Sequence, residues 1–128
     1  MAIEKRISRP RRSLSEAVAA HATLQAKFFR GLGDPTRLRI IRILLRGPQR
    51  VNALVETLGM SQSRVSNHLA CLKWCGYVDT VRNGRFVEYS VSDRRVRALL
   101  EAADAMVADN AAHVAACTRI DDRSRVRR

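Results

Sequence analysis

Two cysteines with helical spacing carry the most distinctive chemistry in this sequence. Cys71 and Cys75 fall in a segment expected to be helical, and residues four apart share one face of a helix, so both sulfurs can bind one ion. Thiolates are soft ligands that select thiophilic metal ions. Two other uses remain open from the residues alone: small buried hydrophobic side chains, or thiols that are oxidised reversibly.

The composition limits the type of protein that holds these thiols. The chain has 128 residues, 46% hydrophobic and 28% charged, which is typical of one folded domain with one core. The best apolar stretch, residues 38–45, is interrupted by Arg39 and Arg42, so we expect no membrane span. The basic N-terminus lacks the apolar stretch of a signal peptide. We therefore expect a cytoplasmic protein with reduced thiols rather than a secreted disulfide framework.

The net charge indicates a polyanionic partner. Lys and Arg total 24 against 12 Asp and Glu, which gives +12. Residues 1–12 contain five basic residues and one acidic residue, and residues 119–128 contain five and two. We predict a basic arm at 1–12, one folded domain at 13–117 and a basic tail at 118–128. Nucleic acid is the expected partner.

Periodicity and capping residues predict a mainly helical domain. We expect helices at residues 13–32, 35–45, 51–58 and 61–75, strands at 77–82 and 86–91, and a long last helix after Asp93. The expected caps are Ser13 with Glu16, Asp34 with Pro35, Ser61, and Asp93. Asn83-Gly84 predicts a hairpin turn. The fold class is therefore mainly α with one β-hairpin, in the order α-α-α-α-β-β-α.

A helix-turn-helix is predicted at the third and fourth helices, which are joined only by Gly59 and Met60. Hydroxyl, amide and guanidinium groups crowd the start of the fourth helix, as a reader of the DNA major groove requires, while its apolar face anchors it. The predicted DNA-binding residues are Ser61, Gln62, Ser63, Arg64, Ser66, Asn67 and His68. Arg82 and Arg85 at the hairpin tip are predicted to contact phosphates or a minor groove.

The chain resembles the ArsR/SmtB family of metal-responsive repressors in three stretches that occur in order: GLGDPTRLRIIRILL, SRVSNHLACLKWCGYV and GRFVEYSV. The resemblance implies a winged helix-turn-helix homodimer, paired through its first and last helices, that binds an inverted-repeat operator and leaves it when an effector binds. It also implies that the seven helix residues lie at the operator and that Arg82 and Arg85 form the wing. The apolar stripe of the last helix, more than one small domain can cover, also favours a dimer.

The sensor sites of this family vary, and two types do not fit this chain. Residues 51–58 lack the Cys-x-Cys of the arsenic-type site, and Arg95 and Met106 stand where the zinc-type site needs histidines. The stretch HLACLKWCG resembles the cadmium/lead sensors of the CmtR subgroup, and streptomycete mercury repressors are the other similar group. The resemblance implies Cys71, Cys75 and Cys117 as ligands of Cd(II), Pb(II) or Hg(II), with His113 as a candidate fourth ligand. Three sulfurs suit these ions better than Zn(II).

Two alternatives to a metal-responsive repressor remain. One is a repressor of the same fold that senses thiol oxidation through Cys71 and Cys75. The other is a DNA-binding protein without a sensor, whose basic tails supply most of the attraction to DNA. An enzyme is not expected, because the sequence has no Gly-rich phosphate loop and no nucleophile paired with a base.

Overall fold

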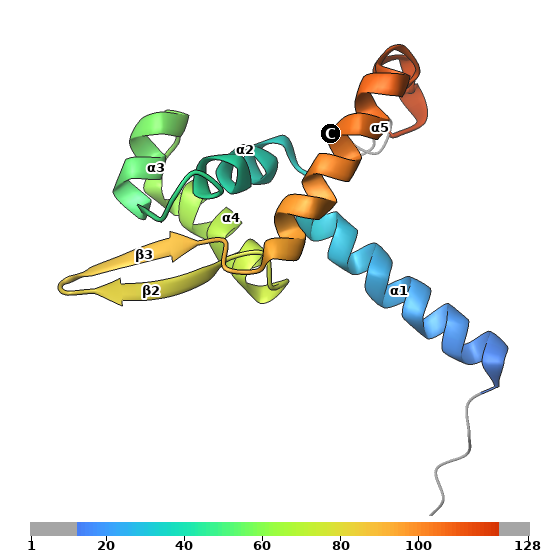
Figure 1. Ribbon diagram of the computed structural model, residues 1–128, viewed down its shortest axis with the longest axis horizontal. Coiled ribbons are helices and arrows are strands. Elements are labelled where there is room, and N and C mark those ends of the chain that lie inside the picture. The colour runs from blue at the N-terminus through green and yellow to red at the C-terminus, as the bar shows by residue number, and fades with distance from the viewer. Residues whose placement is uncertain (1–12, 121–128) are drawn as a thin grey trace, which may run out of the picture.

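The computed structural model describes residues 13–120, and in that range the main elements are helices with a small sheet (Figure 1). In chain order they are α1 (Leu14–Leu32), α2 (Pro35–Leu44), β1 (Gln49–Arg50), α3 (Val51–Leu58), α4 (Gln62–Trp74), β2 (Asp79–Asn83), β3 (Phe86–Ser90) and α5 (Arg94–Ala116). The predicted class and order are confirmed, with β1 as an additional strand. The predicted arm at 1–12 and residues 121–128 of the predicted tail lie outside the described residues, and residues 118–120 are helical.

Four helices begin where the sequence supplies a cap. Ser13 and Glu16 form a reciprocal capping box, in which the Glu16 N–H donates to Ser13 Oγ at 3.2 Å and the Ser13 N–H donates to Glu16 Oε2 at 3.0 Å. Asp34, Ser61 and Asp93 each accept a backbone N–H from the first turn of the helix that follows. The predicted starts of α1, α2, α4 and α5 are therefore confirmed.

One hydrophobic core joins the end of α1 to α2, α3, α4 and the start of α5. Its buried side chains are Leu32, Ile40, Ile41, Leu44, Leu54, Leu58, Val65, Leu69, Leu72, Tyr77, Val78, Val96 and Leu100. The predicted apolar face of α4 is fully buried, since Val65, Leu69 and Leu72 have no exposed surface. Burying an aliphatic side chain of this size contributes about 1.5–3 kcal/mol. The opposite face of α4 is thereby held toward solvent.

The hairpin belongs to a three-stranded sheet in which β3 is central. β3 pairs antiparallel with β2 and with the short β1, which was not predicted. The turn consists of Gly84 and Arg85, because Asn83 pairs with Phe86, so the predicted Asn83-Gly84 turn is wrong by one residue. Gly84 takes a φ of +62°, as glycine does at the first position of a type II′ turn, which leaves Asn83 in strand geometry.

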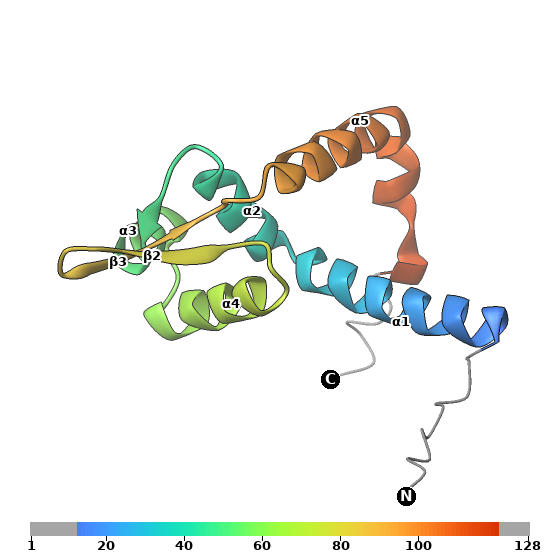
Figure 2. The same ribbon diagram turned by 60° about the horizontal axis from the view of Figure 1, so that its bottom comes forward.

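Two helices, α1 and α5, extend from the side of the core opposite the hairpin tip (Figures 1 and 2). Leu14 and Leu24 on α1 are 82% and 69% exposed, and Met106 and Val107 on α5 are 67% and 51% exposed. α5 changes direction at Asn110, whose φ of −123° is not helical. The single chain therefore leaves the predicted apolar stripe of the last helix largely uncovered.

No helix within residues 13–120 combines the length and the hydropathy that crossing a bilayer requires.

Candidate DNA interface and thiol site

The N-terminal turn of α4 presents most of the predicted DNA-binding residues to solvent. Gly59 takes a left-handed φ of +63° at the end of α3, and this turns the chain into α4. Ser61 Oγ caps α4 by accepting the N–H of Arg64 at 3.3 Å. The exposed members are Ser61, Gln62, Ser63, Arg64 and Asn67, while Ser66 is half-buried. Their hydroxyl, amide and guanidinium groups can donate to and accept from base edges and phosphates.

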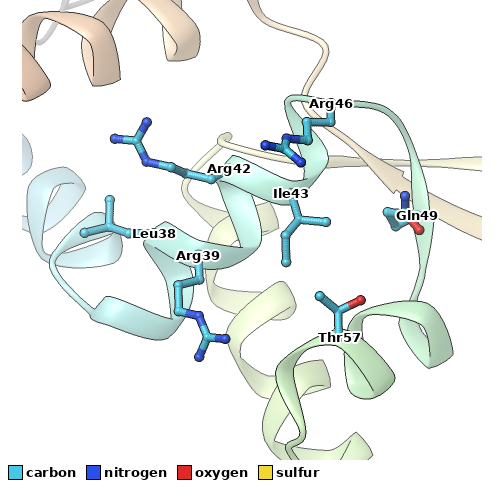
Figure 3. A pocket seen from close by; sticks show the side chains of 7 residues that line it. All are labelled: Leu38, Arg39, Arg42, Ile43, Arg46, Gln49 and Thr57. Carbon is cyan, nitrogen blue, oxygen red and sulfur yellow. The ribbon is translucent and has the colours of Figure 1, made fainter.

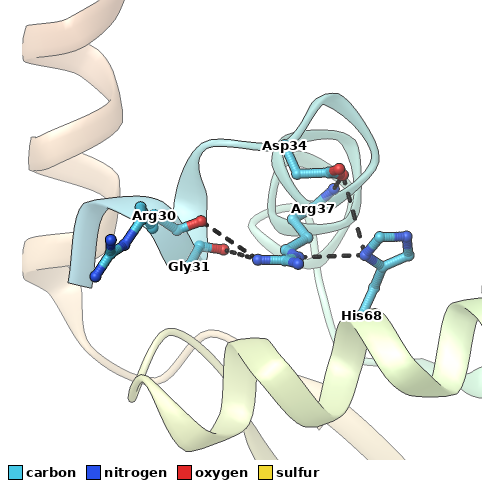
Figure 4. A network of polar contacts seen from close by, with 5 residues as sticks. All are labelled: Arg30, Gly31, Asp34, Arg37 and His68. Atoms are coloured by element: carbon cyan, nitrogen blue, oxygen red, sulfur yellow. Dashed lines mark hydrogen bonds and ion pairs between the residues drawn. The ribbon is translucent and has the colours of Figure 1, made fainter. Parts of the chain in front are cut away.

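His68 is placed differently from its neighbours on α4. Its side chain is 18% exposed and turns toward α2, where Nδ1 accepts a hydrogen bond from Arg37 Nε at 3.2 Å (Figure 4). Asp34 Oδ1 lies 4.0 Å from the same nitrogen. The structure therefore does not bring His68 into the exposed row with Arg64. Arg37 is not among the predicted site residues, because nothing in its spacing to His68 marks the two as a pair.

The two wing arginines, Arg82 and Arg85, are exposed at the hairpin tip, as predicted. The hairpin is attached to the domain through side chains as well as through the sheet. Lys73 Nζ at the end of α4 donates to Thr80 Oγ1 at 3.1 Å. The Arg50 guanidinium carbon lies 3.5 Å from the centre of the Phe86 ring, in a cation–π contact. The tip is thus carried by a supported hairpin that projects away from α1 and α5 (Figure 2).

The thiols of Cys71, on α4, and Cys75, its C-cap residue, lie near each other, as their spacing predicts, and both residues are half-buried. Burial raises the pKa of the Cys75 thiol, and the Cys71 thiol adds to this rise, while Arg37 and Lys27 oppose it. A hollow of about 580 Å³ borders Cys75 and is also lined by Phe28, Gly76, Tyr77, Asp93, Arg95, Val96 and Leu99. The residue Cys75 therefore borders a hollow open to solvent.

Cys117 stays apart from this pair within one chain. It follows the last turn of α5, where its N–H donates to the Val114 carbonyl at 3.2 Å. Among the residues that the structure describes, no three Cys, His, Asp or Glu side chains are grouped closely enough to hold a metal ion. The Cys71–Cys75 pair fits the donor chemistry of a thiophilic ion. A third ligand from Cys117, or a fourth from His113, would have to come from a second copy of the chain.

A further group of basic residues, outside the predicted site, lies on α2 and in the turn that follows it. Arg39, Arg42 and Arg46 line a hollow of about 590 Å³, whose other lining residues are Leu38, Ile43, Gln49 and Thr57 (Figure 3). Arg42 also forms an ion pair with Asp104 of α5. The three-residue spacing of Arg39 and Arg42 along α2 was the signal that could have placed these two on one face. They add positive charge to the folded domain away from the start of α4.

Comparison with known proteins gives matches among bacterial regulators. Residues 34–80 match the family model described as "Bacterial regulatory protein, arsR family". The match runs from the start of α2 into β2 and so includes the whole helix-turn-helix. A probable mercury resistance operon repressor of Streptomyces lividans is 47% identical over 106 residues, which cover 83% of this chain and 85% of that protein.

Solved structures share the fold. A homodimeric winged helix-turn-helix DNA-binding domain from Mycobacterium bovis is similar with a TM-score of 0.65 and 30% identity, covering 77% of this chain and 91% of that chain. The cadmium metal-sensor CmtR from Mycobacterium tuberculosis is similar with a TM-score of 0.52 and 45% identity, covering 59% and 80%. The predicted winged helix-turn-helix is therefore confirmed.

Proposed function

The chain belongs to the ArsR family of bacterial transcriptional regulators, and from this premise we propose that it is a homodimeric repressor released from DNA by a thiophilic heavy-metal ion. Its DNA site is an inverted-repeat operator. Its effector is Hg(II), Cd(II) or Pb(II), bound through cysteine thiolates in the cytoplasm, where thiols stay reduced. The matched relatives are regulators and not enzymes, so the chemistry assigned to this chain is binding.

The observation that carries the proposal is the position of two adjacent thiols on the recognition helix itself. Cys71 shares α4 with the exposed Arg64 and Asn67, and Cys75 is the C-cap residue of the same helix. An ion held by both sulfurs would set the angle of the C-terminal end of α4 and thereby tilt its N-terminal end. The two recognition helices of a dimer enter major grooves ~34 Å apart. A small tilt in each subunit would misalign both half-sites together.

The proposed dimer interface is formed by α1 and α5. Leu14, Leu24, Met106 and Val107 are each more than half exposed in the single chain. Apolar side chains gathered on two helices call for a protein surface that covers them. In this dimer Cys117 of one subunit completes the site formed by Cys71 and Cys75 of its partner, which supplies the third sulfur that one chain does not bring to the pair.

Operator recognition is assigned to the start of α4 and to the hairpin tip. Ser61, Gln62, Ser63, Arg64, Ser66 and Asn67 contact base edges and nearby phosphates in this proposal, and Arg82 and Arg85 contact the backbone or the minor groove beside them. The basic arm at 1–12 and the tail at 118–128 add attraction that does not depend on sequence. His68 supports α4 from its inner side.

A heavy-metal effector is supported by the relatives and by the thiols. One relative is described as a mercury resistance operon repressor, and one similar structure is that of a cadmium sensor. Metal binds the thiolate and not the thiol. Because the pKa of Cys75 is raised, its thiol keeps the proton more readily, and the ion must displace that proton.

Titration of the reduced protein with each ion, followed by ultraviolet absorbance, tests the proposal. Sulfur-to-metal charge-transfer bands report thiolate ligation, and footprinting in parallel reports the operator. We expect a band and loss of a protected inverted repeat at the same metal concentration. A protein that shows no band and keeps its footprint with all three ions would not be a metal-responsive repressor.

The spacing of Cys71 and Cys75, four residues apart along one helix face, also favours a second candidate, sensing of oxidation. Hydrogen peroxide could oxidise the pair, so that one S–S bond replaces two S–H bonds and the peroxide is reduced to two water molecules. Operator release by peroxide in metal-free protein, reversed by dithiothreitol and accompanied by no response to the three ions, would identify this function instead.

A further inference from the structure

We propose that Arg37 is a positioning residue that transmits the position of the Cys75 sulfur to the recognition helix, through Gly31 on one side and His68 on the other. The identity of the signal rests on the proposed function. The link itself consists of contacts made by the chain without any metal. This link gives a role to the Arg37 side chain, which belongs neither to the exposed DNA-binding residues of α4 nor to the thiol pair.

The first contact joins the thiol site to the end of α1. Gly31 is buried, and a Cβ atom at this position would lie 2.7 Å from Cys75 Sγ and 3.6 Å from the Tyr77 ring. The sulfur therefore rests directly against the backbone of α1, with no room for a methyl group between them. A free thiol can rotate away from this contact. A sulfur held by an ion cannot, so its displacement passes to Gly31.

The second contact joins the last turn of α1 to α2. Arg37 Nη1 donates to the Gly31 carbonyl at 3.1 Å and to the Arg30 carbonyl at 3.3 Å (Figure 4). A cationic donor is favoured at the carbonyls of the last helical turn, and the Arg30 carbonyl accepts the Gly33 N–H at 3.3 Å as well. The backbone N–H of Arg37 donates in turn to Asp34 Oδ1 at 3.1 Å, which holds Arg37 at the start of α2.

The third contact reaches α4. Arg37 Nε donates to His68 Nδ1 at 3.2 Å, and His68 follows Asn67 directly and Arg64 by one helical turn. A single planar guanidinium thus uses Nη1 for α1 and Nε for α4. Because its donors keep a fixed relative geometry, a shift of the α1 carbonyls changes the hydrogen bond to α4. A lysine ammonium is a point charge and cannot hold both partners in this way.

A double-mutant cycle on the metal-free protein tests the link without any effector. Arg37→Lys keeps the charge, and His68→Ala removes the acceptor. We expect each to weaken operator binding by about tenfold, and the double variant to be no weaker than the weaker-binding single variant, because both changes remove one interaction. Arg39→Lys on the same helix is the matched control and should alter the affinity by less than about twofold. Losses that simply add in the double variant, with all variants folded by thermal unfolding, would overturn the link.

Operator release by metal then tests the direction of transmission. Arg37→Lys should keep the thiolate charge-transfer band with wild-type stoichiometry, whereas the loss of operator affinity on metal binding should fall from the usual range of about 5–150-fold to about twofold. A normal band with full release in this variant would overturn the relay and leave the proposed function intact. If the wild type shows no band, the proposed function fails, and the metal-free cycle still decides whether the link exists.

Discussion

The Tyr77 hydroxyl donates a hydrogen bond to the Phe28 carbonyl at 2.9 Å, and the two rings stack with their centroids 4.6 Å apart. This pair attaches α1, most of which is exposed, to the segment that follows α4. Tyr77 is 1% exposed, and burial raises its pKa to about 12, with the Cys75 thiol adding to the rise. The hydrogen bond predicts the effect of removing the Tyr77 hydroxyl, and the raised pKa predicts how stability depends on pH.

Tyr77→Phe should lower the free energy of unfolding by about 1 kcal/mol, because the Phe28 carbonyl loses its donor while the ring packing remains. The folded pKa of about 12 lies above the ordinary value of 10. The stabilisation from keeping Tyr77 protonated is therefore complete below pH 10 and is lost as the pH rises from 10 toward 12. Denaturant unfolding of both proteins across this range measures it. An equally steep loss in Tyr77→Phe would assign the pH dependence to other groups.

Serine substitutions of the thiols separate repression from sensing. Cys71→Ser and Cys75→Ser should bind the operator as the wild type does but no longer release it with Hg(II), Cd(II) or Pb(II), because serine is a hard donor. Cys117→Ser should bind metal more weakly and respond partially. Operator affinity measured by fluorescence anisotropy during metal titration gives each result. Unchanged release in the Cys71→Ser, Cys75→Ser double variant would place the sensor elsewhere.

Arg64→Ala should weaken operator binding by ~1–3 kcal/mol if its exposed guanidinium reads a base, with a smaller loss on random DNA. Deleting residues 1–12 should instead weaken binding to both DNAs alike and reduce the salt dependence, because these charges attract phosphates in general. Anisotropy titrations at several salt concentrations distinguish the two. Equal losses on operator and random DNA for Arg64→Ala would show that it contacts only the backbone.

Val107→Glu tests the dimer interface without disturbing the core. Val107 is 51% exposed in the single chain, whereas Leu100 on the same helix is 3% exposed. We expect the wild type to sediment as a dimer at micromolar concentration, and Val107→Glu to give folded monomers that have lost operator binding. Leu100→Glu would bury an unpaired carboxylate and should unfold the domain instead. A monomeric wild type would reject the interface formed by α1 and α5.

Metal affinity should fall as the pH falls. Burial and the neighbouring Cys71 thiol raise the pKa of Cys75, so the protonated thiol is favoured and the ion must displace its proton. Cd(II) titrations at about pH 6 and about pH 8, followed by the charge-transfer band, should give weaker binding at the lower pH. Equal affinity at both values would mean that protonated thiols do not compete with the ion.

Local signals in the sequence were sufficient for most of the fold. Caps such as Ser61 and Asp93 act within a few residues of themselves, so the helix starts could be predicted from spacing. β1 could not, because a strand of two residues exists only through its pairing with β3. The turn moved by one residue because Gly84 alone supplies the positive φ, which leaves Asn83 in the ladder.

In the candidate site too, some residues could be placed from local sequence signals, and others depend on contacts between distant segments. Arg64, Asn67, Cys71 and Cys75 could be placed on their faces of α4 from helical periodicity alone. The inward position of His68 depends on Arg37 from another helix, and a contact between distant segments leaves no periodic signal. The separation of Cys117 from the thiol pair depends on the course of α5, which changes direction at Asn110.

The unpredicted strand β1 affects how the wing and the helix-turn-helix are placed relative to each other. β1 runs directly into α3 and pairs with β3, so the sheet joins the wing to the first helix of the helix-turn-helix. A side-chain hydrogen bond from Lys73 to Thr80 links the wing to α4. In the proposed repressor, the sheet would hold the arginines at the hairpin tip at a set distance from α3 and from α4, which packs on α3. The distance between the wing arginines and the start of α4 would then have to match the distance from the operator's groove to the neighbouring phosphates.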